Sequence, residues 1–311
     1  MPISCLLSVQ SLAPGARVAL VAPSGPLHGQ ADVERGIKTA RSFGWDAVVG
    51  EWVLARYSYF AATDSQRLED FNAALRNDSI DAVWCLRGGY GIMRMLTQID
   101  WDALRRHPKA VMGYSDITAL HAAVGRMCNI VSYHAPVARA ELSPFSRDSF
   151  ARALIDHVDP CGHAGSASNA RVICGGSARG RLVGGNLSVV SSIAGTPYFP
   201  DMRDAILVLE DTNEGLYRMD RMLTQLILTG ALNDIAGIAF GQCTGCDADE
   251  SSDDTRLSRT LDDVLREFAV ALNVPCITGI PLGHIDDQWT IPLGAIATLD
   301  ADALTLNVEI Q

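Results

Sequence analysis

The sequence lacks a long hydrophobic run, an excess of positive charge and a regular spacing of metal-binding residues. In 311 residues no apolar stretch reaches the roughly 18 residues that a membrane-spanning helix needs. Asp and Glu number 36 against 25 Lys and Arg, a formal net charge of −11. An acidic chain of this kind has no electrostatic footprint for nucleic acid or an anionic membrane. We therefore expect small molecules or other proteins as partners.

The eight cysteines form neither a disulfide framework nor a zinc site. Only Cys243 and Cys246 make a C-x-x-C pair, no second pair completes a zinc site, and no H-E-x-x-H is present. Others, such as Cys85, lie in apolar strand-like runs. We expect reduced thiols, no metal and no cofactor. Since residues 1–10 also lack a basic segment followed by a cleavage site, we expect a cytoplasmic protein without a signal peptide.

The acidic segment 247–254, DADESSDD, invites comparison with a calcium-binding loop. It fails the EF-hand pattern, because Ser252 stands where the loop needs Gly and Ser258 where it needs Glu. We predict a solvated surface loop. The C-x-x-C pair before it does not precede a thioredoxin-like helix, so a redox role is the less favoured interpretation.

The first half of the chain alternates short apolar runs with amphipathic stretches. The composition, 48% hydrophobic and 20% charged, is that of an ordinary globular protein. Alternation of strand and helix with short links predicts a parallel sheet covered on both faces. We expect this α/β domain over residues 1–160. Its predicted strands are 17–23, 46–49, 81–86 and 110–114, and its predicted helices are 32–43, 63–76 (with a capping box at Thr63 and Gln66) and 116–127.

The pattern changes after residue 160. Residues 161–176 are rich in Gly, Ser, Ala and Asn without periodicity, which predicts a linker. Residues 177–311 then predict a smaller mixed α+β domain. We expect helices at 184–194, 217–229 and 257–272, strands at 205–210 and 235–241, and short strands from residue 290 onward.

The strongest local signal for chemistry is GYSDIT at 113–118. An apolar strand stops at Ser115 and a helix begins at once. This turn would hold the hydroxyl above the sheet, with the next backbone N–H pointing where an oxyanion forms. Two observations leave an alternative open: serine is a favoured N-cap residue, and Ile117 replaces the final glycine of G-x-S-x-G.

A second signal is RGGYG at 87–91, which ends the neighbouring predicted strand. Its three glycines allow the backbone to approach a ligand closely, and its N–H groups are candidates for a second oxyanion donor. Arg87 is a candidate for binding a carboxylate. The alternatives are a plain βα turn and a nucleotide loop, which the missing G-x-G-x-x-G disfavours.

A nucleophilic serine needs a base. Of the seven histidines, His284 lies in the constrained loop GIPLGH after a predicted strand. Loops at strand ends often carry catalytic side chains. His134 also follows a predicted strand and is a second candidate to line a cleft. An exposed loop histidine without a role remains the alternative for His284.

The base in turn needs an acid to orient it. Glu210 closes the apolar run AILVLE, where a carboxylate is costly unless it has a partner. Asp211 and Glu214, in the polar turn that follows, are rivals. The order Ser115, Glu210, His284 matches that of α/β-hydrolases, although the same geometry occurs in other orders.

Taken together, these residues resemble the LD-carboxypeptidase family, the muramoyltetrapeptide carboxypeptidases. The resemblance covers nearly the whole chain. It implies an N-terminal α/β domain like that of class I glutamine amidotransferases, a smaller C-terminal domain, a cleft between the two, and a homodimer. The motifs that carry it are VAPSG at 21–25, RGGYG at 87–91, GYSDIT at 113–118, GGNL at 184–187, GTP at 195–197, LED at 209–211, GH at 283–284 and PLG at 292–294.

The resemblance also implies a role for each candidate residue. Ser115 would be the nucleophile, His284 the general base and acid, and Glu210 the acid that orients His284. The backbone N–H groups of Asp116 and of Gly89, in the Gly88–Gly89 turn, would form the oxyanion hole. No metal would be needed.

The implied reaction removes the terminal D-alanine from a murein tetrapeptide, a small peptide, during cell-wall recycling. Arg87, Gly88 and Trp289 are candidates for substrate binding. Trp289 departs from the family, which more often has a small polar residue there. An added aromatic favours a sister branch that hydrolyses aminoacyl- or peptidyl-nucleotide antibiotics and gives immunity. A non-catalytic amidotransferase-like binding domain is a further alternative, although amidotransferase chemistry needs a cysteine where this chain has Ser115.

Overall fold

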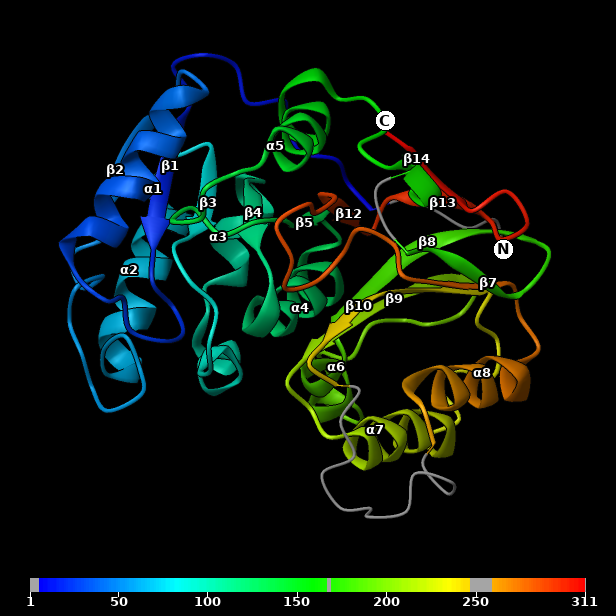
Figure 1. Ribbon diagram of the computed structural model, residues 1–311. Coiled ribbons are helices and arrows are strands. Elements are labelled where there is room, and N and C mark those ends of the chain that lie inside the picture. Colours follow the sequence, from blue (N-terminus) through cyan, green and yellow to red (C-terminus); the bar gives the residue numbers. More distant parts are fainter. Residues whose placement is uncertain (1–5, 167–168, 247–258, 311) are drawn as a thin grey trace.

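The computed structural model describes residues 6–166, 169–246 and 259–310, which form two sheets with helices packed against them (Figure 1). The first sheet has the strand order β12-β5-β4-β3-β1-β2. Its first five strands along the chain run parallel, whereas β12 is antiparallel to β5. The predicted parallel sheet is confirmed. Its strands are β1 (Arg17–Val21), β2 (Asp46–Val49), β3 (Ala82–Cys85), β4 (Ala110–Gly113), β5 (Ser132–His134) and β12 (Ile291–Leu293).

The inner strands β3 and β4 are wholly buried. Their unbroken apolar runs are typical of strands that are covered on both faces. The predicted capping box at Thr63 and Gln66 starts α2. The helices of this part are α1 (Gln30–Ser42), α2 (Asp64–Arg76), α3 (Trp101–Arg106), α4 (Thr118–Cys128) and α5 (Pro144–Ala151), with short turns of helix at η1 (Ile92–Arg94), η2 (Leu96–Gln98), η3 (Ser115–Ile117) and η4 (Arg152–Asp156).

The second sheet is mixed, with the order β6-β14-β13-β8-β9-β10-β11-β7. Strands β8 to β11 run parallel, and the outer strands are antiparallel to their neighbours. Helices α6 (Leu187–Ile193), α7 (Leu216–Leu228) and α8 (Leu261–Leu272) lie together below this sheet in Figure 1. The strands are β6 (Gly162–His163), β7 (Arg171–Cys174), β8 (Ser177–Asn186), β9 (Ala205–Thr212), β10 (Gly237–Thr244), β11 (Cys276–Thr278), β13 (Ile296–Asp300) and β14 (Thr305–Glu309).

The structure corrects the predicted linker. The segment 161–176 contains η5 (Ala164–Ser166) and two strands, β6 and β7, which occupy opposite edges of the second sheet. Edge strands need only one hydrogen-bonding partner, and β6 and β7 are only two and four residues long. A composition rich in Gly and Ser therefore did not reveal them.

The predicted helix at 184–194 begins too early. Gly184 and Gly185 belong to β8 and have φ angles of +123° and +126°, which a helix does not allow. The helix α6 begins only after Asn186, whose side chain accepts a hydrogen bond from the Val189 N–H as its N-cap. The predicted acidic loop 247–254 lies outside the described residues. Within the described ranges, none of the helices is both long and apolar enough to cross a bilayer.

The two sheets meet at the start of α4. The Asn186 N–H, at the end of β8, donates to Thr118 Oγ1 at 2.9 Å. A Cβ on Gly185 would lie only 2.5 Å from the same Thr118 oxygen, so glycine is required for this approach. The contact brings the carboxyl ends of β8 and β9 beside the carboxyl end of β4.

Candidate active site

Ser115 lies in a sharp turn between β4 and α4. Its φ angle is +66°, a left-handed conformation that a non-glycine residue adopts at a cost and that clusters at functional sites. The N-cap interpretation is wrong: the N-caps of η3 and α4 are Tyr114 and Ile117, and neither side chain makes a cap hydrogen bond. Across the part of the chain that the structure describes, the Ser115 hydroxyl makes no hydrogen bond, so it is free to react.

The glycine turn at 87–91 lies directly against this serine. A Cβ on Gly88 would stand 3.0 Å from Ser115 Cβ and 3.3 Å from Ser115 Oγ. The Gly25 N–H donates to the Gly88 carbonyl at 3.1 Å and so attaches this turn to the loop after β1. The structure thus brings together the two glycine-containing motifs that the sequence singled out separately.

Glu210 and His284 form a pair in which the carboxylate is buried and the imidazole is 25% exposed. His284 Nδ1 lies 2.9 Å from Glu210 Oε2, and the Glu210 side chain is 0% exposed. Asn186 Nδ2 donates to the other carboxylate oxygen at 3.3 Å. Gly283 allows the loop to approach, since a Cβ there would lie 3.3 Å from Glu210 Oε2. The expected partner for this strand-end carboxylate is therefore present.

The two rival carboxylates have other partners. Asp211 Oδ2 accepts hydrogen bonds from the Ser188 N–H at 2.8 Å and the Ser188 hydroxyl at 2.7 Å, and so holds the first turn of α6. Glu214 forms an ion pair with Arg218 at 3.5 Å. Of the three candidates, the geometry favours Glu210 as the partner of His284.

The His284 ring packs against Tyr114, the residue before Ser115, with ring centroids 4.9 Å apart. Burial, together with the negative charge of Glu210, raises the pKa of Tyr114, so this ring stays neutral. The ring contact with Tyr114 places His284 beside the nucleophile turn. The residues described include no Ser115–His284 hydrogen bond, and such catalytic bonds often tighten only when substrate binds.

Two sequence candidates do not line a cleft. Trp289 is 2% exposed and belongs to an apolar cluster with Ile280 and Leu282; burial of its large apolar surface explains its place. His134 is fully buried, and burial lowers its pKa well below the usual value. Arg87 is half-buried beside Gly25 and donates to the Pro26 carbonyl.

Asn186 was missed as a functional residue in the sequence, and Asp116 was named for its backbone N–H but not for its side chain. Asn186 contacts both Glu210 and Asp211, and the Asp116 carboxylate is buried beneath the glycine turn. A polar residue at the end of an apolar strand was the available signal for Asn186. Within the described ranges no group of three or more His, Cys, Asp or Glu is placed to hold a metal ion.

A serine in a strained strand–helix turn, a glycine turn against it and a histidine paired with a buried carboxylate are typical of serine hydrolases. Two family models match the chain: the LD-carboxypeptidase N-terminal domain over residues 18–135 and the LD-carboxypeptidase C-terminal domain over residues 179–299. The protein belongs to the LD-carboxypeptidase family, and is a hydrolase of the peptidase class.

Related proteins and solved structures agree with this family assignment. The murein tetrapeptide carboxypeptidase of Pseudomonas aeruginosa is 36% identical over 93% of this chain and 94% of its own length. The crystal structure of a muramoyltetrapeptide carboxypeptidase from Oxalobacter formigenes superposes with a TM-score of 0.81 at 28% identity, covering 95% of this chain and 98% of that one. The microcin C7 self-immunity protein, known from Escherichia coli, shares the fold at a TM-score of 0.87 and 23% identity, covering 98% and 99% of the two chains.

Proposed function

We propose that this protein is a serine LD-carboxypeptidase that removes the terminal D-alanine from murein tetrapeptide. The observation that carries the proposal is Ser115, held with its hydroxyl free at the strained turn between β4 and α4. The pairing of His284 with the buried Glu210 and the relatives named as murein tetrapeptide and muramoyltetrapeptide carboxypeptidases support it.

The mechanism uses Ser115, His284 and Glu210 in turn. Ser115 Oγ attacks the carbonyl carbon of the bond to D-alanine while His284 Nε2 takes the hydroxyl proton. His284 then gives that proton to the leaving amine, and D-alanine departs from the acyl-enzyme. Water, deprotonated by His284, hydrolyses the ester and restores the serine. Glu210 holds Nδ1 at 2.9 Å, which directs Nε2 toward the substrate and stabilises the imidazolium.

The oxyanion would be bound by the backbone N–H groups of Asp116 and Gly89. Asp116 directly follows the nucleophile at the start of η3, which leads into α4. A helix start of this kind adds favourable potential for negative charge. The closeness of Gly88 to Ser115 supports the choice of Gly89, in the same turn, as the second donor. Preorganised donors of this type are commonly the largest single contribution to acyl transfer.

Arg87 is our candidate for binding the terminal carboxylate of the substrate, since its planar guanidinium suits that group.

We also propose a cytoplasmic location and a homodimer. Free thiols are present at Cys85, Cys128, Cys161, Cys174, Cys243 and Cys276, which suits a reducing compartment. The buried position of Trp289 removes the aromatic side chain that favoured the immunity branch.

Mass spectrometry of murein tetrapeptide incubated with the protein tests the substrate. We expect loss of one alanine, equally with and without a strong chelator, and no loss with Ser115→Ala. A parallel incubation with an aminoacyl-adenylate analogue tests the immunity branch. If only the analogue were cleaved, the peptidase would belong to that branch; if activity required added zinc, the serine mechanism would be wrong.

A further inference from the structure

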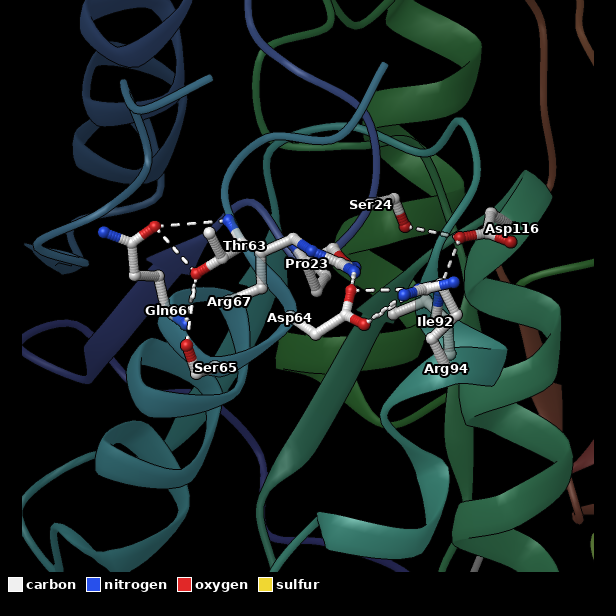
Figure 2. Close-up of polar contacts among 10 residues, drawn as sticks. All are labelled: Pro23, Ser24, Thr63, Asp64, Ser65, Gln66, Arg67, Ile92, Arg94 and Asp116. Carbon is white, nitrogen blue, oxygen red and sulfur yellow. Dashed lines mark hydrogen bonds and ion pairs between the residues drawn. The ribbon is translucent and has the colours of Figure 1, made fainter. Parts of the chain in front are cut away.

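The Asp116 carboxylate is buried where three loops of the first sheet meet. It is 3% exposed. Its Oδ2 accepts hydrogen bonds from Ser24 Oγ at 2.7 Å and from the Ile92 N–H at 3.0 Å (Figure 2). Ser24 lies after β1, Ile92 lies after the glycine turn that follows β3, and Asp116 itself follows the nucleophile after β4. One carboxylate therefore ties all three strand ends together.

These bonds restrain the glycine turn at both of its ends. The Gly25 N–H holds the Gly88 carbonyl at 3.1 Å, and Asp116 holds the Ile92 N–H at the other end. Gly89, whose N–H is the proposed second oxyanion donor, lies between these anchors. The distance between the two oxyanion donors thus depends on the Asp116 side chain as well as on its backbone.

The charges around this carboxylate make a buried anion tolerable next to the nucleophile. Burial raises the pKa of Asp116, while the Ser24 hydroxyl, the Ile92 and Gly91 N–H groups and the Arg67 guanidinium oppose that rise. Arg67 is itself buried, donates to the Pro23 carbonyl and pairs with Asp64 (Figure 2). Its positive charge offsets the carboxylate, which would otherwise disfavour an oxyanion nearby.

We propose that the Asp116 side chain is a positioning residue for the oxyanion hole. It holds the turn at 88–92 so that the Gly89 and Asp116 N–H groups both face the developing negative charge. The inference rests on the proposed serine mechanism but not on the identity of the peptide substrate. It assigns to the carboxylate a role separate from that of the Asp116 backbone.

The test is the rate at which a fluorophosphonate labels Ser115, followed by intact-protein mass spectrometry, because this reaction uses the oxyanion hole whatever the natural substrate is. Loss of one oxyanion donor costs about 10²–10³ in rate. We expect Asp116→Ala to lower the labelling rate and the kcat on murein tetrapeptide by about 100-fold, with KM changed by less than about threefold. Asp116→Asn, which keeps an accepting oxygen, should retain the rate within about fivefold.

Asp70 offers a matched control. It is 8% exposed and accepts hydrogen bonds from the Glu51 and Trp52 N–H groups, both at 2.9 Å, after β2. Asp70→Ala should lower the melting temperature much as Asp116→Ala does, without slowing the labelling of folded protein. Ser24→Ala, which removes the side-chain hydrogen bond to Asp116, should slow labelling about tenfold. This variant replaces Asp116→Ala in the test if Asp116→Ala does not fold.

The outcomes separate the two proposals. A wild-type protein that is not labelled at Ser115 overturns the serine mechanism and this inference with it. If the wild type is labelled but releases no alanine, only the substrate proposal fails. Labelling of Asp116→Ala or Ser24→Ala at the wild-type rate, or an equal loss in Asp70→Ala, overturns the positioning role. Asp116→Asn as slow as Asp116→Ala would do the same.

Discussion

Glu210 and Asp211 are adjacent carboxylates that face opposite sides of the second sheet. Successive residues of a strand point to opposite faces. Glu210 shares the face of Ile206 and Val208, toward the loop that carries His284, whereas Asp211 shares the face of Leu207 and Leu209, toward α6. This alternation decides which carboxylate reaches the histidine.

Glu210→Gln should lower kcat by roughly 10³–10⁴, because the amide keeps the shape but loses the charge that stabilises the imidazolium. Ser115→Ala should lower it by about 10⁴–10⁶, and His284→Ala should approach that loss, since the three residues act as a unit. All three variants should stay folded, as judged by circular dichroism, and Ser115→Ala should still bind substrate.

Asp211→Asn is the matched control, because it changes the neighbouring carboxylate in the same way. It should weaken the hydrogen bonds in the first turn of α6 and so lower the free energy of unfolding by about 1 kcal/mol. The kcat should stay within a few-fold of the wild-type value. Near-normal turnover in Glu210→Gln together with loss in Asp211→Asn or Glu214→Gln would show that the acid is assigned to the wrong residue.

At the scale of elements, the end of β8 against the start of α4 sets the distance between the two halves of the site. Gly185 and Asn186 meet Thr118 there. Ser115 lies just before α4, and Glu210 is the register partner of Asn186 on β9. A shift of β8 away from α4 would therefore move Glu210 and His284 away from Ser115.

Gly185→Ala should lower kcat by about 10²-fold or more, because its Cβ would lie 2.5 Å from Thr118 Oγ1 and push the two elements apart. Gly162→Ala is the control: its φ angle of +106° is also positive, but a Cβ there meets nothing within 4 Å. Both variants should lose about 1–3 kcal/mol of stability through backbone strain, measured by urea unfolding. Equal kcat values for the two variants would contradict the role of this contact.

At the scale of the whole molecule, the chain crosses between the sheets more than once. The strand β12 leaves the second half to pair with β5, with Ile291 opposite His134. Beside this junction His121 is buried, with Nδ1 3.0 Å from Ser132 Oγ and Nε2 2.8 Å from the Gly113 carbonyl. Burial lowers the pKa of His121 to about 4, so its protonation is linked to unfolding of the structure around it.

The free energy of unfolding should fall as the pH falls from about 6.5 toward 4. The unfolded His121, with a pKa of about 6.5, binds a proton in this range that the folded side chain does not bind. Its contribution is fully present above pH 6.5, and the loss reaches about 3 kcal/mol near pH 4. Urea unfolding of the wild type and of His121→Gln at pH 7 and pH 5 measures the difference in slope.

An exposed histidine provides the control for this experiment. His163→Gln changes a side chain at the edge of the second sheet and should keep the wild-type dependence on pH. Equal slopes for His121→Gln and the wild type would mean that His121 is not the linked group.

Local features followed from the sequence because their causes lie within a few residues. Unbroken apolar runs identified the buried strands β3 and β4, the capping box at Thr63 began α2, and the strand–serine–helix run marked Ser115. The pairing of sheet-edge strands did not follow. The strands β6 and β7 in segment 161–176 are only two and four residues long, and their partners are far along the chain.

The sequence by itself determined the family, the parallel first sheet and the candidates Ser115 and His284. Only the tertiary structure decided that Glu210, rather than Asp211, meets His284, 74 residues away. It also decided that Trp289 is buried and that the Asp116 carboxylate joins three loops. The physical reason is that these outcomes depend on contacts between side chains distant in sequence, which burial and hydrogen bonding select only when the sheets pack together.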